Sequence, residues 1–254
     1  MSPEGGLLER LGGTGGRILK SALRQAGTRC MICGRALHGR LTDACCPDCS
    51  LALRLRLGDY CPLCGEPYAS PEEPISLCGP CRRSGKPWSG FGMYSVYRGA
   101  LRDALIAFKF HADFGYLRLL QRCLLQARQA HGAGSGCEVV APVPLHPRKL
   151  RQRGFNQSLE LCRPLAPRLN ATLAPKALSR LRDTSSQSGL DRTERRRNMR
   201  GSIAADPSVV RSRNVLLVDD VYTTGITAKV CARALQMAGA KRVDLLVLAR
   251  VPAA

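Results

Sequence analysis

The segment "NVLLVDDVYTTGITA" (residues 214–228) joins an apolar run to two adjacent acids and then to threonines around a glycine. The apolar run at 215–218 predicts a buried strand. Residues 227–238 have helical spacing, and Gly239 is placed to end that helix. Ligands of α/β sheets bind at the carboxyl ends of strands, where Asp219 and Asp220 fall. The segment therefore predicts a ligand site between a strand and a helix.

The residues after the acid pair have the chemistry of phosphate binding. Backbone N–H groups and the helix dipole favour an anion at a helix start, and threonine hydroxyls add donors. The residues expected to line this loop are Thr223, Thr224, Gly225 and Thr227. The two acids suit hydroxyl groups or a cation beside the phosphate. Phosphate next to vicinal hydroxyls describes a ribose 5-phosphate.

Three rival nucleotide or phosphate sites can be compared with this segment. A Walker loop needs GxxxxGK[ST] and a dinucleotide fingerprint needs GxGxxG, and both are absent here. A receiver domain needs a phosphorylated Asp and a Lys on later strands, yet only 34 residues follow Asp220. An ordinary strand-to-helix turn would leave the two acids and three threonines without a role.

The surrounding sequence alternates between strand and helix patterns. Strands are expected at 94–97, 137–144 and 242–250. Helices are expected at 99–110, at 114–130 and from residue 156 up to Pro164. The stretch "SGKPWSGFG" (84–92) has the composition of a linker. Strands that alternate with helices predict a parallel α/β sheet covered on both faces.

Eight of the thirteen cysteines form four CxxC pairs, separated by twelve residues in the first half and thirteen in the second. Structural zinc sites use four thiolates, and two CxxC turns joined by a short loop supply them. With no export signal, metal ligation is favoured over disulfides. The expected zinc ligands of two ribbons in series are Cys30, Cys33, Cys46, Cys49, Cys61, Cys64, Cys78 and Cys81.

Three details of this cysteine module stay open at the level of sequence. Cys45 could replace Cys46, His38 could enter the site, and the pairs could combine sequentially or crossed. Residues 30–81 carry 4 basic and 6 acidic residues, and thiolate-bound zinc adds negative charge. A scaffold or protein-contact role therefore fits this module better than phosphate binding.

The net charge of +20 is concentrated in one part of the chain. Residues 148–200 contain 14 basic and 4 acidic residues, a net charge of +10 over 53 residues. Such a field suits phosphate-bearing partners, including single-stranded DNA. Only Phe155 supplies an aromatic ring within this basic stretch, so electrostatic binding is favoured over base stacking.

No apolar run approaches the roughly 18–20 residues of a membrane span. The N-terminal segment has glycines and charges within its apolar stretch and does not resemble a signal peptide, so a cytoplasmic protein is expected. Arg17, Lys20 and Arg24 on a short helix would suit peripheral contact with the inner face of a membrane. A helix docked on its own protein is the favoured interpretation.

The segment "VLLVDDVYTTGITA" resembles the phosphoribosyl-pyrophosphate (PRPP) motif of type I phosphoribosyltransferases. "CPLCGEP" (61–67), "APVPLHPRKLRQRGFNQS" (141–158) and "TSSQSGLDRTERRRNMRGSI" (184–203) resemble, in that order, segments of the ComF/GntX group. The resemblance covers residues 30–250. It implies an N-terminal extension (1–29), a double zinc ribbon (30–85) and a type I phosphoribosyltransferase-like domain with a parallel sheet (90–254).

The resemblance also implies residue roles. Asp219 and Asp220 would be the catalytic acids that hold the ribose 2- and 3-hydroxyls, and the threonine loop would hold the 5-phosphate. Residues 180–200 match a mobile loop that closes over the site. Magnesium would be carried by PRPP itself. The implied phosphate and pyrophosphate contacts are Lys149, Arg151, Arg153, Arg195, Arg197 and Asn198. His111 and His146 lie in matching segments and are expected to be structural.

Two classes of function follow. The first is a phosphoribosyltransferase with an unknown acceptor, in which pyrophosphate leaves ribose C1 and cationic side chains stabilise it. The second is a non-catalytic, PRPP-sensing component that binds nucleic acid. The family resemblance implies a link to natural competence, the handling of incoming single-stranded DNA and protein partners in the uptake machinery. A conventional phosphoribosyltransferase of nucleotide metabolism is the further alternative.

Overall fold

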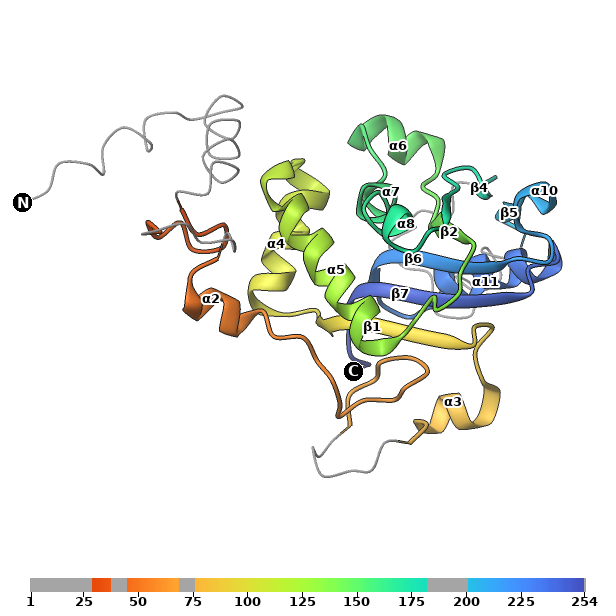
Figure 1. Ribbon diagram of the computed structural model, residues 1–254, viewed down its shortest axis with the longest axis horizontal. Coiled ribbons are helices and arrows are strands. Elements are labelled where there is room, and N and C mark those ends of the chain that lie inside the picture. The colour runs from red at the N-terminus through yellow and green to blue at the C-terminus, as the bar shows by residue number, and fades with distance from the viewer. Residues whose placement is uncertain (1–28, 38–44, 69–75, 182–200, 254) are drawn as a thin grey trace, which may run out of the picture. The chain divides into compact units, whose positions relative to one another are not determined.

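The computed structural model describes residues 29–37, 45–68, 76–181 and 201–253 (Figure 1). The chain divides into two compact units, Met1–Arg54 with Arg98–Leu120, and Leu55–Tyr97 with Gln121–Ala254. The first two CxxC pairs belong to the first unit, and the last two belong to the unit that carries the sheet. The expected domain boundary between residues 85 and 90 stays a prediction.

The second unit is built on a five-stranded parallel sheet, which confirms the predicted fold class. Its strands, in spatial order, are β1 (Gly90–Val96), β7 (Arg242–Arg250), β6 (Asn214–Tyr222), β2 (Val139–Pro142) and β3 (Thr172–Leu173). The apolar runs of β6 and β7 are almost wholly buried, as expected for central strands covered on both faces.

Helices hold the sheet through apolar residues at helical spacing. Helices α7 (Gln157–Cys162) and α8 (Leu165–Arg168) pack on β2, while α11 (Ile226–Met237) packs on β6 and β7 (Figure 1). Helix α11 buries Ala228, Cys231, Ala232 and Leu235 on one stripe. The antiparallel pair β4 (Leu178–Arg180) and β5 (Ile203–Ala205) also packs against α11. The other elements of this unit are α3 (Gly79–Ser84), α6 (Pro147–Arg153) and α10 (Pro207–Val210).

In the first unit, α2 (Pro47–Ala52) packs against α4 (Gly99–His111). The predicted apolar face of α4 is confirmed, because Leu101, Ala104, Leu105 and Phe108 are buried. A short 3₁₀ turn, η1 (Phe114–Tyr116), leads into α5 (Leu117–His131), whose sequence spans the boundary between the units. None of the helices that the structure describes is long and apolar enough to cross a bilayer.

One local expectation is wrong and another is confirmed. The stretch "SGKPWSGFG" is no linker, because Trp88 is 4% exposed and β1 begins at Gly90. Its glycines and serines are typical of loops, but the indole ring of Trp88 packs in the hydrophobic core and so holds this stretch against the sheet-bearing unit. The helix expected from residue 156 up to Pro164 is confirmed as α7, which ends at Cys162, because Pro164 has no N–H with which to continue it.

The strand expected at 215–218 is longer than its apolar run. Strand β6 continues to Tyr222 because β7 pairs alongside it, matching Asp219 with Val247 and Tyr222 with Arg250. The two acids therefore lie within the last residues of a central strand, and a three-residue connection separates that strand from α11.

Candidate functional site

The acid pair is fixed by hydrogen bonds at the carboxyl end of β6. Asp219 Oδ1 accepts hydrogen bonds from the Ser158 hydroxyl, at 3.1 Å, and from the Asp220 N–H, at 2.9 Å. Asp220 Oδ1 accepts one from the Val221 N–H at 2.9 Å. Asp220 is 3% exposed, so its carboxylate lies where electrostatic interactions with a ligand are weakly screened.

The loop after the acid pair makes a tight turn into α11. Gly225 is the residue before the helix and has φ 73° and ψ 9°, a left-handed conformation that favours glycine. A Cβ at this position would come 2.2 Å from the Tyr222 hydroxyl oxygen. Thr223 and Thr224 are exposed, and Thr227 is half-buried on the first turn of α11. The turn thus presents hydroxyls and helix-start N–H groups together, as phosphate binding requires.

A second segment, between β2 and α7, reaches the acid pair from the neighbouring strand. Asn156 caps α7, and its side chain also donates to the Val143 carbonyl at 3.1 Å. Arg153 Nη1 donates to Gln157 Oε1 at 2.6 Å. Burial lowers the pKa of Arg153, and the nearby carboxylate of Asp220 opposes that shift. A guanidinium therefore lies close to the acid pair.

The structure brings together only part of the expected site. Arg153 reaches the acid pair, whereas Lys149 and Arg151 lie earlier on α6 and Arg151 is exposed. His146 accepts a hydrogen bond from the Arg148 N–H, which makes it the cap of α6 and agrees with a structural role. The candidates Arg195, Arg197 and Asn198, the loop 182–200, the extension 1–28 and His38 lie outside the described residues.

Sequence reasoning missed two parts of this site. Gln157 and Ser158 are 4% and 1% exposed, and the Ser158 hydroxyl donates to Asp219, but the sequence prediction gives them only a place in a helix. Two adjacent polar residues that a helix buries near a strand end were a usable signal. Arg250 donates to the Thr223 carbonyl in the loop at 223–227, and its place as the last residue of β7 does not indicate this contact in the sequence.

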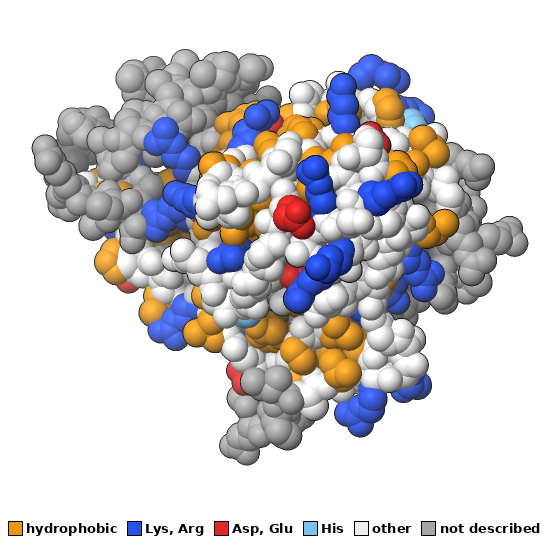
Figure 2. All heavy atoms as spheres, turned by 45° about the vertical axis from the view of Figure 1, so that its right-hand side comes forward, with side chains coloured by type: hydrophobic (Ala, Val, Ile, Leu, Met, Phe, Trp, Pro, Cys, Tyr) orange, Lys and Arg blue, Asp and Glu red, His pale blue; other side chains and the backbone are white. Residues whose placement is uncertain are grey.

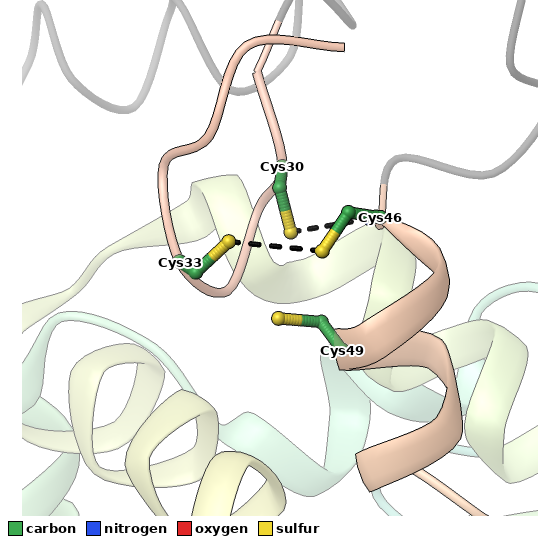
Figure 3. Close-up of side chains that lie close together, drawn as sticks. All are labelled: Cys30, Cys33, Cys46 and Cys49. Atoms are coloured by element: carbon green, nitrogen blue, oxygen red, sulfur yellow. Dashed lines mark hydrogen bonds between the residues drawn. The ribbon is translucent and has the colours of Figure 1, made fainter.

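The cysteines form two separate four-sulfur clusters with sequential pairing. The first cluster contains Cys30, Cys33, Cys46 and Cys49, shown in Figure 3, and the second contains Cys61, Cys64, Cys78 and Cys81. Within each cluster the Sγ atoms all lie within 4.8 Å of one another. Cys46, rather than Cys45, faces the other sulfurs, and its Sγ lies 3.7 Å from that of Cys33.

Both clusters fit a tetrahedral zinc ion. Zinc–sulfur bonds of about 2.3 Å place neighbouring sulfurs roughly 3.8 Å apart, and Cys64 and Cys78 have Sγ atoms 3.6 Å apart. Burial raises the pKa of Cys30, but backbone N–H groups of Cys33 and Cys46 outweigh burial and lower the pKa to about 6. The pKa of Cys61 is lowered in the same way against burial, by N–H groups that include that of Cys78. In each cluster one cysteine thus has a pKa shifted toward the thiolate, the form that binds metal.

Comparisons with known proteins relate this chain to a domain family and to several relatives. Residues 156–254 match the model of the phosphoribosyl transferase domain. The chain is 34% identical to the DNA utilization protein YhgH of Salmonella typhimurium over 209 residues, which is 81% of this chain and 89% of that protein. It is 28% identical to Competence protein F of Haemophilus influenzae, covering 87% and 96% of the two chains. A solved structure of the allosteric regulatory enzyme of purine biosynthesis is 19% identical, with a TM-score of 0.34, over 52% of this chain and 25% of that one.

Proposed function

Because the chain belongs to the ComF/GntX family of phosphoribosyltransferase-like proteins, we propose that residues 219–227 bind PRPP in a role linked to natural competence. One observation carries this proposal. An acid pair, of which Asp220 is buried, lies near the carboxyl end of a central parallel strand, and a left-handed glycine three residues after that strand precedes a twelve-residue helix. This arrangement suits a ribose 5-phosphate, with the hydroxyls at the acids and the phosphate at the helix start.

The proposed ligand makes three sets of contacts. The ribose 2- and 3-hydroxyls donate to Asp219 and Asp220, and the 5-phosphate accepts from the loop at 223–227. The pyrophosphate lies toward Arg153, with Lys149 and Arg151 on the same helix. Magnesium is carried by the pyrophosphate and ribose oxygens, because it keeps much of its own hydration and needs few protein ligands.

Binding by the acid pair is tested by calorimetry with PRPP and magnesium on the full, metal-loaded chain. Asp220→Asn removes a charge that PRPP hydroxyls would contact, and we expect at least a roughly tenfold loss of affinity. Asp103→Asn is the matched control, because Asp103 has a side chain that is 70% exposed and lies on α4. Equal affinities in the two variants would contradict the proposal.

Catalysis is proposed as transfer of the phosphoribosyl group from PRPP to an unidentified acceptor. Cleavage at ribose C1 releases pyrophosphate, and Arg153 is placed to stabilise its charge. Pyrophosphate release in the presence of candidate bases or nucleic acids measures this step. If the protein bound PRPP tightly but released no pyrophosphate with any acceptor tested, it would instead be assigned as a PRPP sensor.

A role in handling single-stranded DNA is supported by the names of two relatives and by charge. The face shown in Figure 2 carries many Lys and Arg side chains, with acidic side chains at few points between them. If strand phosphates contact this surface, log K must fall steeply with log salt concentration. We expect Asp219→Asn to lose PRPP binding while it keeps strand binding. Failure to bind single-stranded DNA even at low salt would contradict this role.

Zinc occupancy of the two clusters is the remaining part of the proposal. Metal analysis of the purified chain should return two zinc ions per molecule. One ion would show that a cluster that can hold zinc stays empty, and none would contradict the assignment.

A further inference from the structure

Arg250, the last residue of β7, has a guanidinium group that connects the second cluster to the phosphate loop. Its Nε donates to the Cys64 carbonyl at 3.1 Å, and its Nη1 donates to the Thr223 carbonyl at 2.8 Å. Its Nη2 pairs with the Glu66 carboxylate. The side chain is 8% exposed, so these hydrogen bonds form away from bulk water.

The same guanidinium also touches the residue that shapes the loop. It lies 4.9 Å from the ring centroid of Tyr222, and Nη1 lies 3.4 Å from the Tyr222 carbonyl oxygen. The Tyr222 ring in turn occupies the space that a Cβ at Gly225 would need. Arg250 therefore fixes both the ring under the turn and two carbonyl groups at the start of it.

The other end of this connection is the turn of the second cluster. The Cys61 N–H donates to the Glu66 carbonyl and the Gly65 N–H to the Cys61 carbonyl, each at 2.8 Å. A metal ion bound by Cys61 and Cys64 would hold this turn closed. The acceptors that hold Arg250, the Cys64 carbonyl and the Glu66 carboxylate, would then stay in place.

Trp88 provides a parallel contact between the two sites. Its Nε1 donates to the Leu63 carbonyl at 2.9 Å, inside the CxxC turn. Its ring packs edge-on against Tyr222, with centroids 6.0 Å apart. Trp88 is the chain's one tryptophan, so its fluorescence reports on this junction alone.

We propose that Arg250 is a positioning residue through which metal in the second cluster holds the loop at 223–227 in the shape that binds the sugar phosphate. The inference rests on the proposed PRPP site. Loss of metal from the second cluster would release the Cys61–Glu66 turn, leave Arg250 with fewer acceptors and loosen the Thr223 and Tyr222 carbonyls. The second cluster then controls ligand affinity without touching the ligand.

The test compares Arg250→Lys with Arg242→Lys in the full, metal-loaded chain. Both residues lie on β7 and pair with a carboxylate, but Arg242 is half exposed and pairs with Asp244 at its far end. Lysine keeps the charge and loses the fork of donors. We expect Arg250→Lys to weaken PRPP binding roughly tenfold, the size of one charged hydrogen bond. Arg242→Lys should bind as the wild type does.

A second readout needs no ligand. Amide hydrogen exchange at 223–227 should become faster in Arg250→Lys. It should also become faster in Cys78→Ser, which removes a ligand of the second cluster. Trp88 fluorescence should change in both variants. An Arg250 role limited to general stability would lower the melting temperature but leave loop exchange and affinity unchanged well below it. That result would overturn the inference. If the wild type bound no PRPP, the proposed function would fail, while the exchange comparison would still decide the positioning role.

Discussion

The two cysteine clusters have the same local construction in different surroundings. In each, the first cysteine N–H donates to a carbonyl five residues later, to Arg35 in the first and Glu66 in the second, both at 2.8 Å. In each, the third cysteine is followed by a short helix, α2 or α3, with proline in its first turn. Spacing and turn chemistry alone therefore account for both metal sites.

The two clusters differ in the residues that surround them. In the first cluster Cys33 is exposed, whereas the second cluster has three fully buried cysteines that share one core with Trp88 and the central strands. Arg35 pairs with Asp48 through side chains that are 67% and 73% exposed. Glu66, at the equivalent position, pairs with the buried Arg250. The spacing of the cysteines therefore predicts where a metal ion could bind, and the packing around each cluster determines which part of the fold would depend on that ion.

The largest expected difference comes from removing the first ligand of each cluster. Cys61→Ser should destabilise the sheet-bearing unit by about 4 kcal/mol or more, because metal binding there is coupled to packing of the main core. Cys30→Ser should leave the unfolding transition seen by Trp88 nearly unchanged, since the first cluster belongs to the other unit. Thermal unfolding followed by Trp88 fluorescence measures both. Equal shifts of the melting temperature in the two variants would contradict the expectation that only the second cluster stabilises the sheet-bearing unit.

The equivalent ion pairs give the next largest contrast. Glu66→Gln leaves the Arg250 charge buried with a weaker partner and should cost about 3 kcal/mol. Arg35→Gln breaks an exposed pair, which solvent screens, and should leave the free energy of unfolding almost unchanged. Urea unfolding of the two variants beside the wild type provides the comparison. A similar small loss for both would mean that Arg250 is satisfied without Glu66.

The glycines that follow the two CxxC turns offer a smaller contrast. Gly34 and Gly65 have φ of 75° and 68°, so alanine strains the backbone to a similar degree at both. A Cβ at Gly34 would meet open space, whereas one at Gly65 would lie 2.6 Å from the Met93 sulfur. Gly65→Ala should therefore cost about 1–2 kcal/mol more than Gly34→Ala. Chemical denaturation measures the difference, and equal losses would contradict tight packing at the second turn.

The smallest effect is a pH dependence restricted to the second unit. His131 is half-buried and hydrogen-bonded to the Tyr60 hydroxyl at 2.9 Å, and burial lowers its pKa below the ordinary 6.5. The folded state thus binds this proton less readily than the unfolded state. The resulting stability is present above pH 6.5 and is lost as the pH falls below it. His131→Asn should flatten this slope in the Trp88 transition, and an unchanged slope would assign it to other groups.

Much of the framework followed from local sequence. The bounds of β7 and the parallel sheet came from apolar runs, and the metal clusters came from spacing. These features depend on residues close together in the chain, so they can be predicted from local sequence patterns.

The connections between sites did not follow from sequence. Trp88 contacts Leu63 and Tyr222, and Arg250 contacts residues near positions 64 and 223, so each joins segments far apart in the chain. Neither the single tryptophan nor one arginine among many shows from the sequence which distant segments it contacts. Their roles depend on the strand order β1-β7-β6, which brings these segments together.

The central claim is that the segment after β6 binds PRPP. Hydrogen exchange of the metal-loaded chain, measured with and without PRPP and magnesium, tests it residue by residue. Slower exchange should be concentrated in the amides at 223–227, where the 5-phosphate is expected to bind. Unchanged exchange there at saturating PRPP, or protection confined to another part of the chain, would contradict the account.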